Sequence, residues 1–473
     1  MSLVLVTGSF SVLHPGHMRL FRFAKECGDR LIVGVNSDRI CTALLPERLR
    51  LEGVQSNTWV DEAFLLDEPV EQAILRFRPD IVVKGKEYES KFNPELAALS
   101  QYGGKLLFSS GEVAFSSLDL IRREFLESDS RWMKLPEDYL KRHQIETSKL
   151  AILVRNFSSL KVCVVGDLII DEYITCQPLG MSQEDPTIVV TPIDHARFIG
   201  GAGIVAAHAA GLGASVRFIS IAGQDEAYKF AESTLKSAGV ESYLLLDKSR
   251  PTTLKQRFRS HGKSLLRVSH LHQAAISLEL QEQVFQKFKN AIENAELVVF
   301  SDFNYGCLPQ VLVGRLIKIS QEKNLKLAAD SQSSSQVGDI SRFKNMDLIT
   351  PTEREARVST RNNEDGLVVL AKQLKDQSHA KNILLKMGEE GLLIHAPNNP
   401  KEDWLTDRIG ALNPVPKDVA GAGDSLLVTS AMTLACGGNI WEAACLGSMA
   451  AAIQVGRVGN TLIKAQELMR ELV

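Results

Sequence analysis

Short apolar runs alternate with stretches of helical periodicity along this chain, and the alternation forms two successive sets. In the first set we expect strands at residues 3–7, 31–36, 59–66, 81–84 and 105–109, with helices such as 18–27 and 71–77. The second set opens with a strand at 162–167 and continues through strands at 216–221, 297–301, 325–329, 348–350 and 383–386. Strands that alternate with helices are typical of α/β domains built on parallel sheets. The sequence therefore predicts two α/β domains.

A charged, helix-favouring stretch at residues 127–161 separates the two sets. We place a first domain at residues 1–128, a helical linker at 129–158 and a second domain at 159–473. A chain of 473 residues is also too long for one ordinary hydrophobic core, so length alone predicts two or three domains.

The composition indicates a globular protein that handles small molecules. Hydrophobic residues make up 44% of the chain, the net charge is −3, and no basic run stands out. We therefore expect neither nucleic acid nor a membrane as a partner. The chain opens on a strand without a basic leader, and no apolar run is long enough to span a membrane. These features predict a cytoplasmic protein.

The seven cysteines are scattered along the chain and show no C-x-x-C spacing. An odd number of cysteines without a pattern argues against a disulfide framework and against a zinc site. We therefore expect the protein to work in a reducing compartment.

A glycine-rich stretch near the C-terminal end is the strongest indication of chemistry. Residues 417–426 read Lys-Asp-Val-Ala-Gly-Ala-Gly-Asp-Ser-Leu, directly before a helix of small residues. Gly421 and Gly423 let the backbone turn tightly, so that N–H groups at the helix start converge on an anion. Asp424, beside this anion hole, would accept a proton from a hydroxyl that attacks a bound phosphoryl group. The alternative is an ordinary loop in which Asp424 caps the helix.

Two histidines lie in the loop between the first strand and the first helix. His14 and His17 are three residues apart, with Gly16 between them. Open α/β sheets bind ligands at this position, and histidines at a helix start can face a phosphate. The alternatives are two surface histidines or a metal pair, but no further Cys, His or Asp cluster lies nearby to complete a metal site. We therefore favour a nucleotide site.

The motif around these histidines, G-x-F-x-x-x-H-x-G-H from Gly8 to His17, resembles the signature of the cytidylyltransferase-like nucleotidyltransferases. The resemblance implies a Rossmann-like fold in which both histidines act on nucleotide phosphates. A substrate phosphate would attack the α-phosphorus of the nucleotide and displace pyrophosphate, usually with Mg²⁺. The nucleotide-binding residues that it implies are Gly8, Ser9, Phe10, Lys84, Ser116 and Ser117.

Further stretches extend the resemblance through the first domain, and these are residues 35–38, 47–48, 78–85, 102–104 and 115–117. They are similar to the adenylyltransferase half of bifunctional heptose-phosphate kinase/adenylyltransferases. The second domain resembles the other half of these enzymes, a ribokinase-like (PfkB) sugar kinase, over its whole length. This resemblance implies an α/β sandwich with a small β lid. It rests on motifs in the expected order at residues 165–173, 198–203, 253–257, 301–303 and 386–391.

The kinase resemblance also assigns roles to individual residues. Asp424 is the base, and the amides of Gly421, Ala422 and Gly423 stabilise the phosphoryl group transferred from ATP with Mg²⁺. The residues expected to bind the sugar are Asp171, Gly200, Gly201, Lys255 and Arg257. The residues expected at the nucleotide are Lys386, Gly388 and Gly391, and the expected metal ligand is Glu355. The structural alternatives are a turn at Asp171, helix packing on the two glycines at 200–201, and an ordinary hairpin at 386–391.

Several positions depart from the family pattern. In the first domain, Ser11 replaces an acidic residue, Leu118 replaces a hydroxyl, and the basic loop at 41–46 is shortened. In the second domain, Ile204 and Thr352 each stand where an Asn is usual, and Tyr305 stands where a Lys is usual. An apolar side chain cannot replace the hydrogen bonds of an amide, so substrate choice or efficiency is expected to differ. The order of the two domains is also reversed relative to the common fused enzyme.

These observations favour a bifunctional enzyme of nucleotide-sugar synthesis of the ADP-heptose type. It would phosphorylate a sugar phosphate with ATP, by resemblance heptose 7-phosphate at O1, and transfer a nucleotidyl group to a sugar 1-phosphate. One alternative is an active kinase whose transferase domain is weakened or serves another sugar or polyol phosphate. Another is a non-catalytic protein that binds nucleotides or sugar phosphates. Residues 185–197 are similar to the lid that pairs subunits in ribokinase-like dimers, so we expect a homodimer through the kinase domain.

Overall fold

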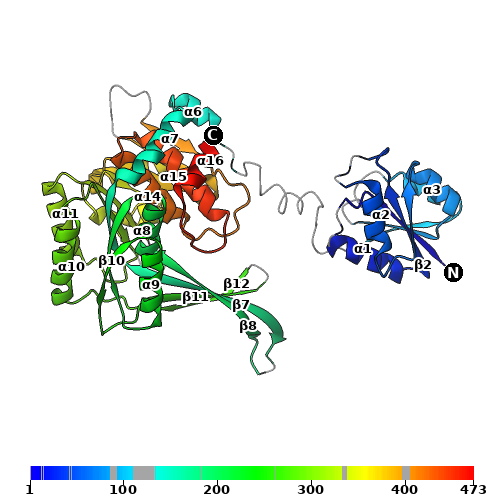
Figure 1. Cartoon of the computed structure of the whole chain (residues 1–473), viewed down its shortest axis with the longest axis horizontal. Helices are drawn as coiled ribbons and strands as arrows, with labels where there is room; N and C mark the ends of the chain where they lie inside the picture. Colours follow the sequence, from blue (N-terminus) through cyan, green and yellow to red (C-terminus); the bar gives the residue numbers. More distant parts are fainter. Residues whose placement is uncertain are drawn as a thin grey trace. The chain divides into compact units, whose positions relative to one another are not determined.

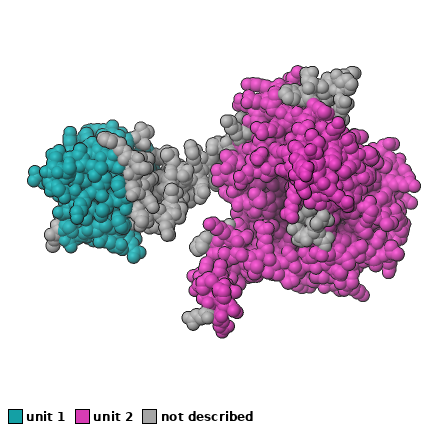
Figure 2. All heavy atoms as spheres, turned by 180° about the vertical axis from the view of Figure 1, so that it is seen from behind, with its two compact units in different colours: residues 1–130 teal, residues 131–473 magenta. Residues whose placement is uncertain are grey.

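The computed structural model describes residues 2–472 except 12, 14, 42, 44, 86–92, 110–132, 134, 183, 261–262, 333–337 and 397–404. Four residues singled out from the sequence, His14, Ser116, Ser117 and Leu118, lie outside the described residues. The chain divides into two compact units, residues 1–130 and 131–473 (Figure 2).

Unit 1 is built on an all-parallel five-stranded sheet with the order β3-β2-β1-β4-β5. Its strands are β1 (Leu3–Gly8), β2 (Arg30–Asn36), β3 (Glu62–Leu66), β4 (Ile81–Gly85) and β5 (Lys105–Ser109). Its helices are α1 (Pro15–Glu26), α2 (Glu47–Gln55), α3 (Val70–Phe77) and α4 (Glu95–Leu99). Val4 and Val6 lie in one core cluster and Leu5 in another, so the sheet is covered on both faces. The parallel sheet expected from the sequence is confirmed.

Unit 2 contains a nine-stranded sheet with the order β10-β9-β6-β13-β14-β15-β16-β17-β18. The first seven of these strands are parallel, and β17 and β18 are antiparallel. The strands are β6 (Lys161–Gly166), β9 (Ser215–Ala222), β10 (Glu241–Leu246), β13 (Leu297–Asp302), β14 (Lys326–Ser331), β15 (Leu348–Ile349), β16 (Asn382–Lys386), β17 (Leu392–His395) and β18 (Thr406–Ile409).

Helices cover both faces of this large sheet (Figure 1). Along β6, Val162 and Val164 belong to one buried cluster, and Cys163 and Val165 to the other. The first cluster is closed by α8 (Ala202–Gly211), α14 (Ala422–Ala435), α15 (Ile440–Val455) and α16 (Ala465–Leu472). The second is closed by α10 (Leu278–Ala291), α11 (Gln310–Glu322), α12 (Glu353–Thr360) and α13 (Leu367–Ser378). Helix α9 (Glu226–Ser237) lies between β9 and β10 in the chain.

A separate four-stranded sheet, which we call the lid, extends from the body of unit 2 (Figure 1). Its strands have the order β12-β11-β7-β8 and are β7 (Leu168–Met181), β8 (Ile188–Gly201), β11 (Thr253–Ser260) and β12 (Lys263–His270). Strands β7 and β11 leave the body next to residues expected to bind the sugar. The α/β sandwich with a small β lid is therefore confirmed.

The described part of the stretch expected as a helical linker belongs to the core of unit 2. It forms α6 (Glu137–Arg142) and α7 (Thr147–Asn156), and Leu150 and Val154 of α7 are fully buried. The hydroxyl of Tyr139 donates to the carbonyl oxygen of Trp441 at 2.9 Å, and the His143 ring stacks on the Trp441 indole at 4.1 Å. Besides its charged residues, this stretch has an apolar face, and that face packs against α15 and α16.

No helix in the described part of the chain is both long and apolar enough to cross a membrane.

Candidate active sites

The glycine-rich stretch of unit 2 forms the N-terminus of α14. Gly421 is the N-cap, with a φ of 76°, and a Cβ there would lie 2.5 Å from the Asn460 Oδ1 atom. This left-handed conformation and close contact both require glycine. The first N–H groups of a helix have no partners within the helix, so they point to the space before α14. The glycine-rich turn therefore starts the helix, and its role as an anion hole stays a prediction.

Asp424 is the third residue of α14 and is 5% exposed. It is not the helix cap, because Gly421 occupies that position, so the alternative of an N-capping Asp424 is wrong. The Gln332 amide donates to Asp424 Oδ1 at 3.4 Å. Burial, together with the nearby carboxylate of Asp330, raises the pKa of Asp424 to about 7. A carboxyl group with this pKa can take up and release a proton near neutral pH.

Lys386 lies beside the same helix start. It is the last residue of β16, and its Nζ is 2.8 Å from Asp330 Oδ2. A Cβ on Gly423 would lie 3.1 Å from the Lys386 Nζ, so the lysine amine reaches the glycine-rich turn itself. Burial, opposed in part by Lys386, raises the pKa of Asp330 to about 6. Asp330 is a residue that sequence reasoning missed, although it lies at the carboxyl end of an apolar strand, as Asp302 does.

Glu355 and Thr352 form a capping box at the start of α12. The Thr352 N–H donates to Glu355 Oε2 at 2.7 Å, and the Glu355 N–H donates to Thr352 Oγ1 at 3.2 Å. Threonine can therefore hold the helix start where the family pattern has Asn. Glu355 is buried and acts electrostatically on both Lys386 and Asp330. The structure thus brings Glu355 to the Lys386 side of the site.

Asp171, on β7, lies among the other residues expected to bind the sugar. A Cβ on Gly200 would lie 2.5 Å from Asp171 Oδ2, so glycine is required for this carboxylate to fit. Asn460 donates to Asp171 Oδ2 at 3.2 Å, and the Arg257 guanidinium is 3.5 Å from Oδ1. Burial raises the pKa of Asp171, against the opposing effect of Arg257. Asn460 connects this cluster to Gly421, and sequence reasoning missed it.

Lys255 and the loop after β13 complete this region. The Lys255 ammonium lies over the rings of Phe303 and Tyr305, at 5.3 Å and 5.1 Å from their centroids. Tyr305 is therefore a buried platform for Lys255. Ile204, by contrast, is 1% exposed within the α8 core, so its side chain serves packing.

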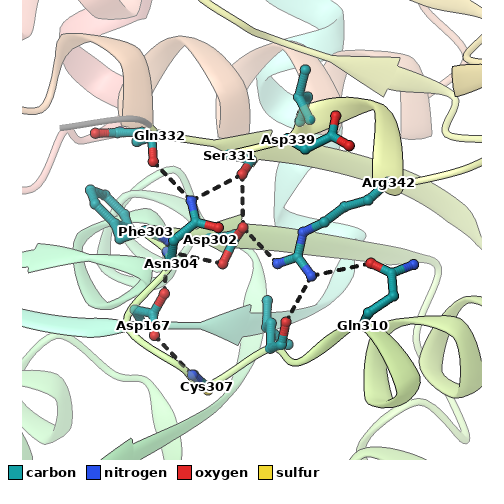
Figure 3. A network of polar contacts seen from close by, with 12 residues as sticks. Asp167, Asp302, Phe303, Asn304, Cys307, Gln310, Ser331, Gln332, Asp339 and Arg342 are labelled. Carbon is teal, nitrogen blue, oxygen red and sulfur yellow. Dashed lines mark hydrogen bonds and ion pairs between the residues drawn. The ribbon is translucent and has the colours of Figure 1, made fainter. Parts of the chain in front are cut away.

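Two buried aspartates hold the loop that carries these rings (Figure 3). The Asp167 carboxylate accepts N–H groups from Phe303 at 2.7 Å and from Cys307 at 3.2 Å. Asp302 accepts from Arg342 at 2.7 Å and from the Ser331 hydroxyl at 2.7 Å (Figure 3). Burial and the neighbouring Asp302 raise the pKa of Asp167 to about 6. This network fixes the turn between β13 and α11.

Asp418 joins the lid to the glycine-rich turn, and sequence reasoning also missed this role. Its carboxylate accepts the Tyr173 hydroxyl of β7 at 2.7 Å and the backbone N–H of Ala420 at 3.1 Å. It also accepts the N–H of Gly459 at 3.1 Å. Residues 245 positions apart meet here, so no local pattern in the sequence could indicate the contact.

The turn expected at the nucleotide has the geometry of a tight connection between β16 and β17. Gly388 has a φ of 62° and opens a short 3₁₀ turn, Gly388–Glu390. Gly391 has a φ of 95°, and a Cβ there would lie 2.1 Å from the Ile409 carbonyl oxygen. Both glycines are therefore required by the backbone, as in the hairpin alternative. Their role at a nucleotide stays a prediction.

In unit 1, the structure brings together Gly8, Phe10 and His17. A Cβ on Gly8 would lie 2.9 Å from the Phe10 ring, so glycine lets this ring fold against the end of β1. The edge of the Phe10 ring meets the His17 imidazole with centroids 5.1 Å apart. Phe10 has a φ of 43°, which places this loop residue in the left-handed region. The described residues of this motif at the end of β1 therefore turn tightly.

Arg50 of α2 supports the same loop. It is 2% exposed, and its guanidinium donates to the Ser9 carbonyl oxygen at 2.5 Å and pairs with Asp38 at 2.6 Å. Sequence reasoning missed Arg50, because nothing in the sequence distinguishes it from any other cationic residue of a helix. Lys84, expected at the nucleotide, pairs with Glu95 at 2.6 Å, and its role at a nucleotide stays a prediction.

Two family models match the chain. Residues 159–466 match the family described as pfkB family carbohydrate kinase, and residues 5–105 match the family described as Cytidylyltransferase-like. The order expected from the motifs, with the transferase-like part first, is confirmed.

Known proteins agree with these matches. The Bifunctional protein HldE of Desulfatibacillum aliphaticivorans is 31% identical over 320 residues, which cover 67% of this chain and 64% of that relative. Phosphofructokinase-2 from Escherichia coli superposes with a TM-score of 0.54 at 17% identity, over 66% of this chain and 98% of that one. Ribokinase from Thermotoga maritima superposes with a TM-score of 0.52 at 19% identity, over 66% and 99% of the two chains.

The two solved structures show the ribokinase-like fold. The pfkB match extends over more than half of the chain. The chain therefore belongs to the pfkB family of carbohydrate kinases, and a cytidylyltransferase-like domain precedes its kinase domain.

Proposed function

We propose that the chain is a bifunctional transferase of nucleotide-sugar synthesis. Unit 2 would phosphorylate a sugar phosphate with ATP, and unit 1 would transfer a nucleotidyl group to a sugar 1-phosphate. The observation that carries the kinase proposal is the position of Asp424, a buried carboxylate at the anion hole of α14 with a pKa near 7. The similarity to HldE proteins supports the pairing of the two activities.

The phosphoryl transfer follows from this geometry. Asp424 takes the proton from a sugar hydroxyl while the hydroxyl oxygen bonds to the γ-phosphorus of ATP. The bond between that phosphorus and the bridging oxygen breaks, and ADP leaves. The amides of Gly421, Ala422 and Gly423 at the start of α14 stabilise charge on the phosphoryl oxygens.

The donor set around Lys386 also suits Mg²⁺. Mg²⁺ prefers oxygen ligands and in phosphoryl-transfer sites uses one or two carboxylates together with phosphates and water. No group of three His, Cys, Asp or Glu that could hold a metal occurs among the described residues, but such a cage is not needed here. Glu355 and Asp330 are the buried carboxylates that would hold the ion, which neutralises phosphate charge when bound.

The acceptor would be held by Asp171 and the basic side chains of β11. Asp171 can accept hydrogen bonds from sugar hydroxyls, and Lys255 and Arg257 can pair with a phosphate on the sugar. By family similarity we propose heptose 7-phosphate, phosphorylated at O1, as this acceptor. In unit 1, His17 and, from the sequence, His14 would contact the phosphates of the nucleotide, as would Ser116 and Ser117. All seven cysteines are free thiols, which supports the cytoplasmic location that we propose.

Separate assays of the two products test this proposal. We expect purified protein to release ADP from ATP with one member of a panel of sugar 7-phosphates or related sugar phosphates. We expect it to release pyrophosphate from a nucleoside triphosphate with a sugar 1-phosphate. ADP release alone would favour the kinase with a weakened or different transferase. Neither product from correctly folded protein would contradict both activities and favour a binding protein.

We also propose that the lid pairs two copies of the chain. Large apolar side chains are exposed on its strands, including Met181 and Ile188, which are opposite each other on β7 and β8 and 60% and 58% exposed. Burying such side chains against a second copy would remove them from water. Light scattering should therefore give twice the mass of one chain. Ile188→Glu should give monomers at the same concentration, because the pairing would bury its charge.

The control for this experiment is Leu278→Glu. Leu278 is 80% exposed at the start of α10, outside the lid, so this variant should remain a dimer. A monomeric wild-type protein at working concentration would contradict the lid dimer.

A further inference from the structure

The structure places the amine of Lys386 against the glycine-rich turn. Its Nζ lies 3.1 Å from the position of a Cβ on Gly423 and 2.8 Å from Asp330 Oδ2. Its side chain is 13% exposed, so water screens this charge only weakly. A side chain at position 423 would therefore press on the amine.

The lysine amine faces a carboxylate in this setting, because Asp330 Oδ2 is 2.8 Å from its Nζ. The ammonium lies beside the helix start, where backbone N–H groups already favour an anion. Three acidic side chains, Asp330, Glu355 and Asp424, act on it electrostatically. Asp330 is the one hydrogen-bond partner of this ammonium among the described residues, and an ammonium has three donors, so donors remain for a second anion.

We propose that Lys386 is a catalytic residue that binds the phosphoryl group during its transfer. This inference rests on the proposed kinase function and extends it. The ammonium pairs with Asp330 in the free protein and donates to the γ-phosphoryl oxygens when ATP is bound. During transfer the oxygen of the sugar bonds to phosphorus, the bond to ADP breaks and Asp424 receives the proton. The Lys386 ammonium compensates charge on the phosphoryl oxygens.

The proposed role differs from that of a general contact with the nucleotide. A residue that contacts the base or the first two phosphates affects ATP and ADP alike. A residue that contacts the γ-phosphoryl group discriminates ATP from ADP and acts on turnover. A third possible role of Lys386 is purely structural, namely to neutralise Asp330. Removing the lysine would then lower activity only because the buried Asp330 carboxylate is left uncompensated.

Binding and turnover of Lys386→Met test the proposal. We expect this variant to bind ATP about 10-fold or more weakly while its affinity for ADP stays within about 3-fold, because one charge-assisted contact is lost. We expect kcat of sugar-phosphate-dependent ADP release to fall by about 100- to 1,000-fold. Lys386→Arg should recover part of kcat, since it restores the charge. Equal losses for ATP and ADP, or an unchanged kcat, would overturn the proposal.

Two further variants exclude a structural explanation. Lys386→Met with Asp330→Asn removes both charges of the pair, and if ATP binding measured without Mg²⁺ then returned to the wild-type level, Lys386 would serve only to neutralise Asp330. Lys381→Met is the matched control, because Lys381 lies just before β16 and its Nζ is also 2.8 Å from an aspartate, Asp347. We expect Lys381→Met to keep the ratio of ATP to ADP affinity. A wild-type protein that binds no ATP would contradict the kinase proposal itself, and with it this one.

Discussion

Asp424→Asn is expected to lower sugar-phosphate-dependent ADP release by about 100- to 10,000-fold, the usual contribution of a general base. Asparagine keeps the shape of the side chain and can still accept from Gln332, so α14 and the affinity for ATP should be retained. The amide cannot take a proton from the sugar hydroxyl. The measurement is steady-state ADP release, together with nucleotide binding and thermal unfolding of the same preparation.

Asp347→Asn is the control for this variant. Asp347 is also a buried aspartate, but it accepts the N–H of Leu327 at the amino ends of the strands, away from α14. Its replacement should cost stability and leave turnover per folded molecule nearly unchanged. If Asp424→Asn turned over at the wild-type rate, Asp424 would not be the base.

The raised pKa of Asp424 also sets the pH dependence of turnover and of stability. The base must be ionised, so turnover should fall about 10-fold per pH unit below a pKa of about 7. The folded protein binds this proton more tightly than the unfolded chain does. The stabilisation from this proton is therefore present at low pH and is lost as the pH rises through about 7. Asp424→Asn should accordingly be no less stable than the wild type at pH 8.

His17→Ala should abolish most pyrophosphate release and leave ADP release unchanged. In unit 1 the imidazole lies at the start of α1 against the Phe10 ring, where it can donate to a nucleotide phosphate. We expect a loss of about 100-fold or more, as for other donors that stabilise charge in a transition state. The kinase should be unaffected because unit 2 has its own sheet and core.

The control for this prediction is Arg22→Ala, on the same helix. Arg22 is exposed and pairs with Glu26 on α1, so its removal should affect neither product. Pyrophosphate release that survives in His17→Ala, or an equal loss of both activities, would show that the nucleotidyl site is wrongly placed.

Much of the fold could be predicted because its signals are local. Alternating apolar runs and helical periods predict parallel sheets, and glycines at 421 and 423 predict a tight turn. Boundaries were less predictable, since Trp59 precedes β3 and the strand begins only at Glu62. The stretch at 129–158 carries charges typical of a linker, but apolar side chains in it, such as Phe157, are buried in the core of unit 2. Local patterns do not reveal which surface an amphipathic helix will meet.

The candidate site was predictable only where its residues are close together in the sequence. Asp424 and the turn before it were found because the chemistry and the backbone requirement lie in a few consecutive residues. Asp330, Asp418 and Asn460 were missed because each acts through a partner distant in the chain, such as Asp171, which is 289 residues from Asn460. The carboxyl ends of parallel strands bring such residues together, and only the three-dimensional structure shows which of them meet.

The departures from the family pattern have physical explanations in three cases. Ile204 fills the core beneath α8, Tyr305 supports the Lys255 ammonium, and Thr352 forms a capping box with Glu355. None of these substitutions removes the buried base, the anion hole or the Lys386 cation. They therefore favour an active kinase over a binding protein.

We infer that unit 2 transfers a phosphoryl group from ATP to a sugar phosphate at Asp424, and phosphorus NMR of the reaction mixture distinguishes this transfer from hydrolysis of ATP. We expect a new sugar phosphomonoester signal, formed in step with ADP by the wild-type protein and absent with Asp424→Asn. ADP accompanied only by inorganic phosphate, or a new sugar phosphate formed equally well by Asp424→Asn, would contradict it.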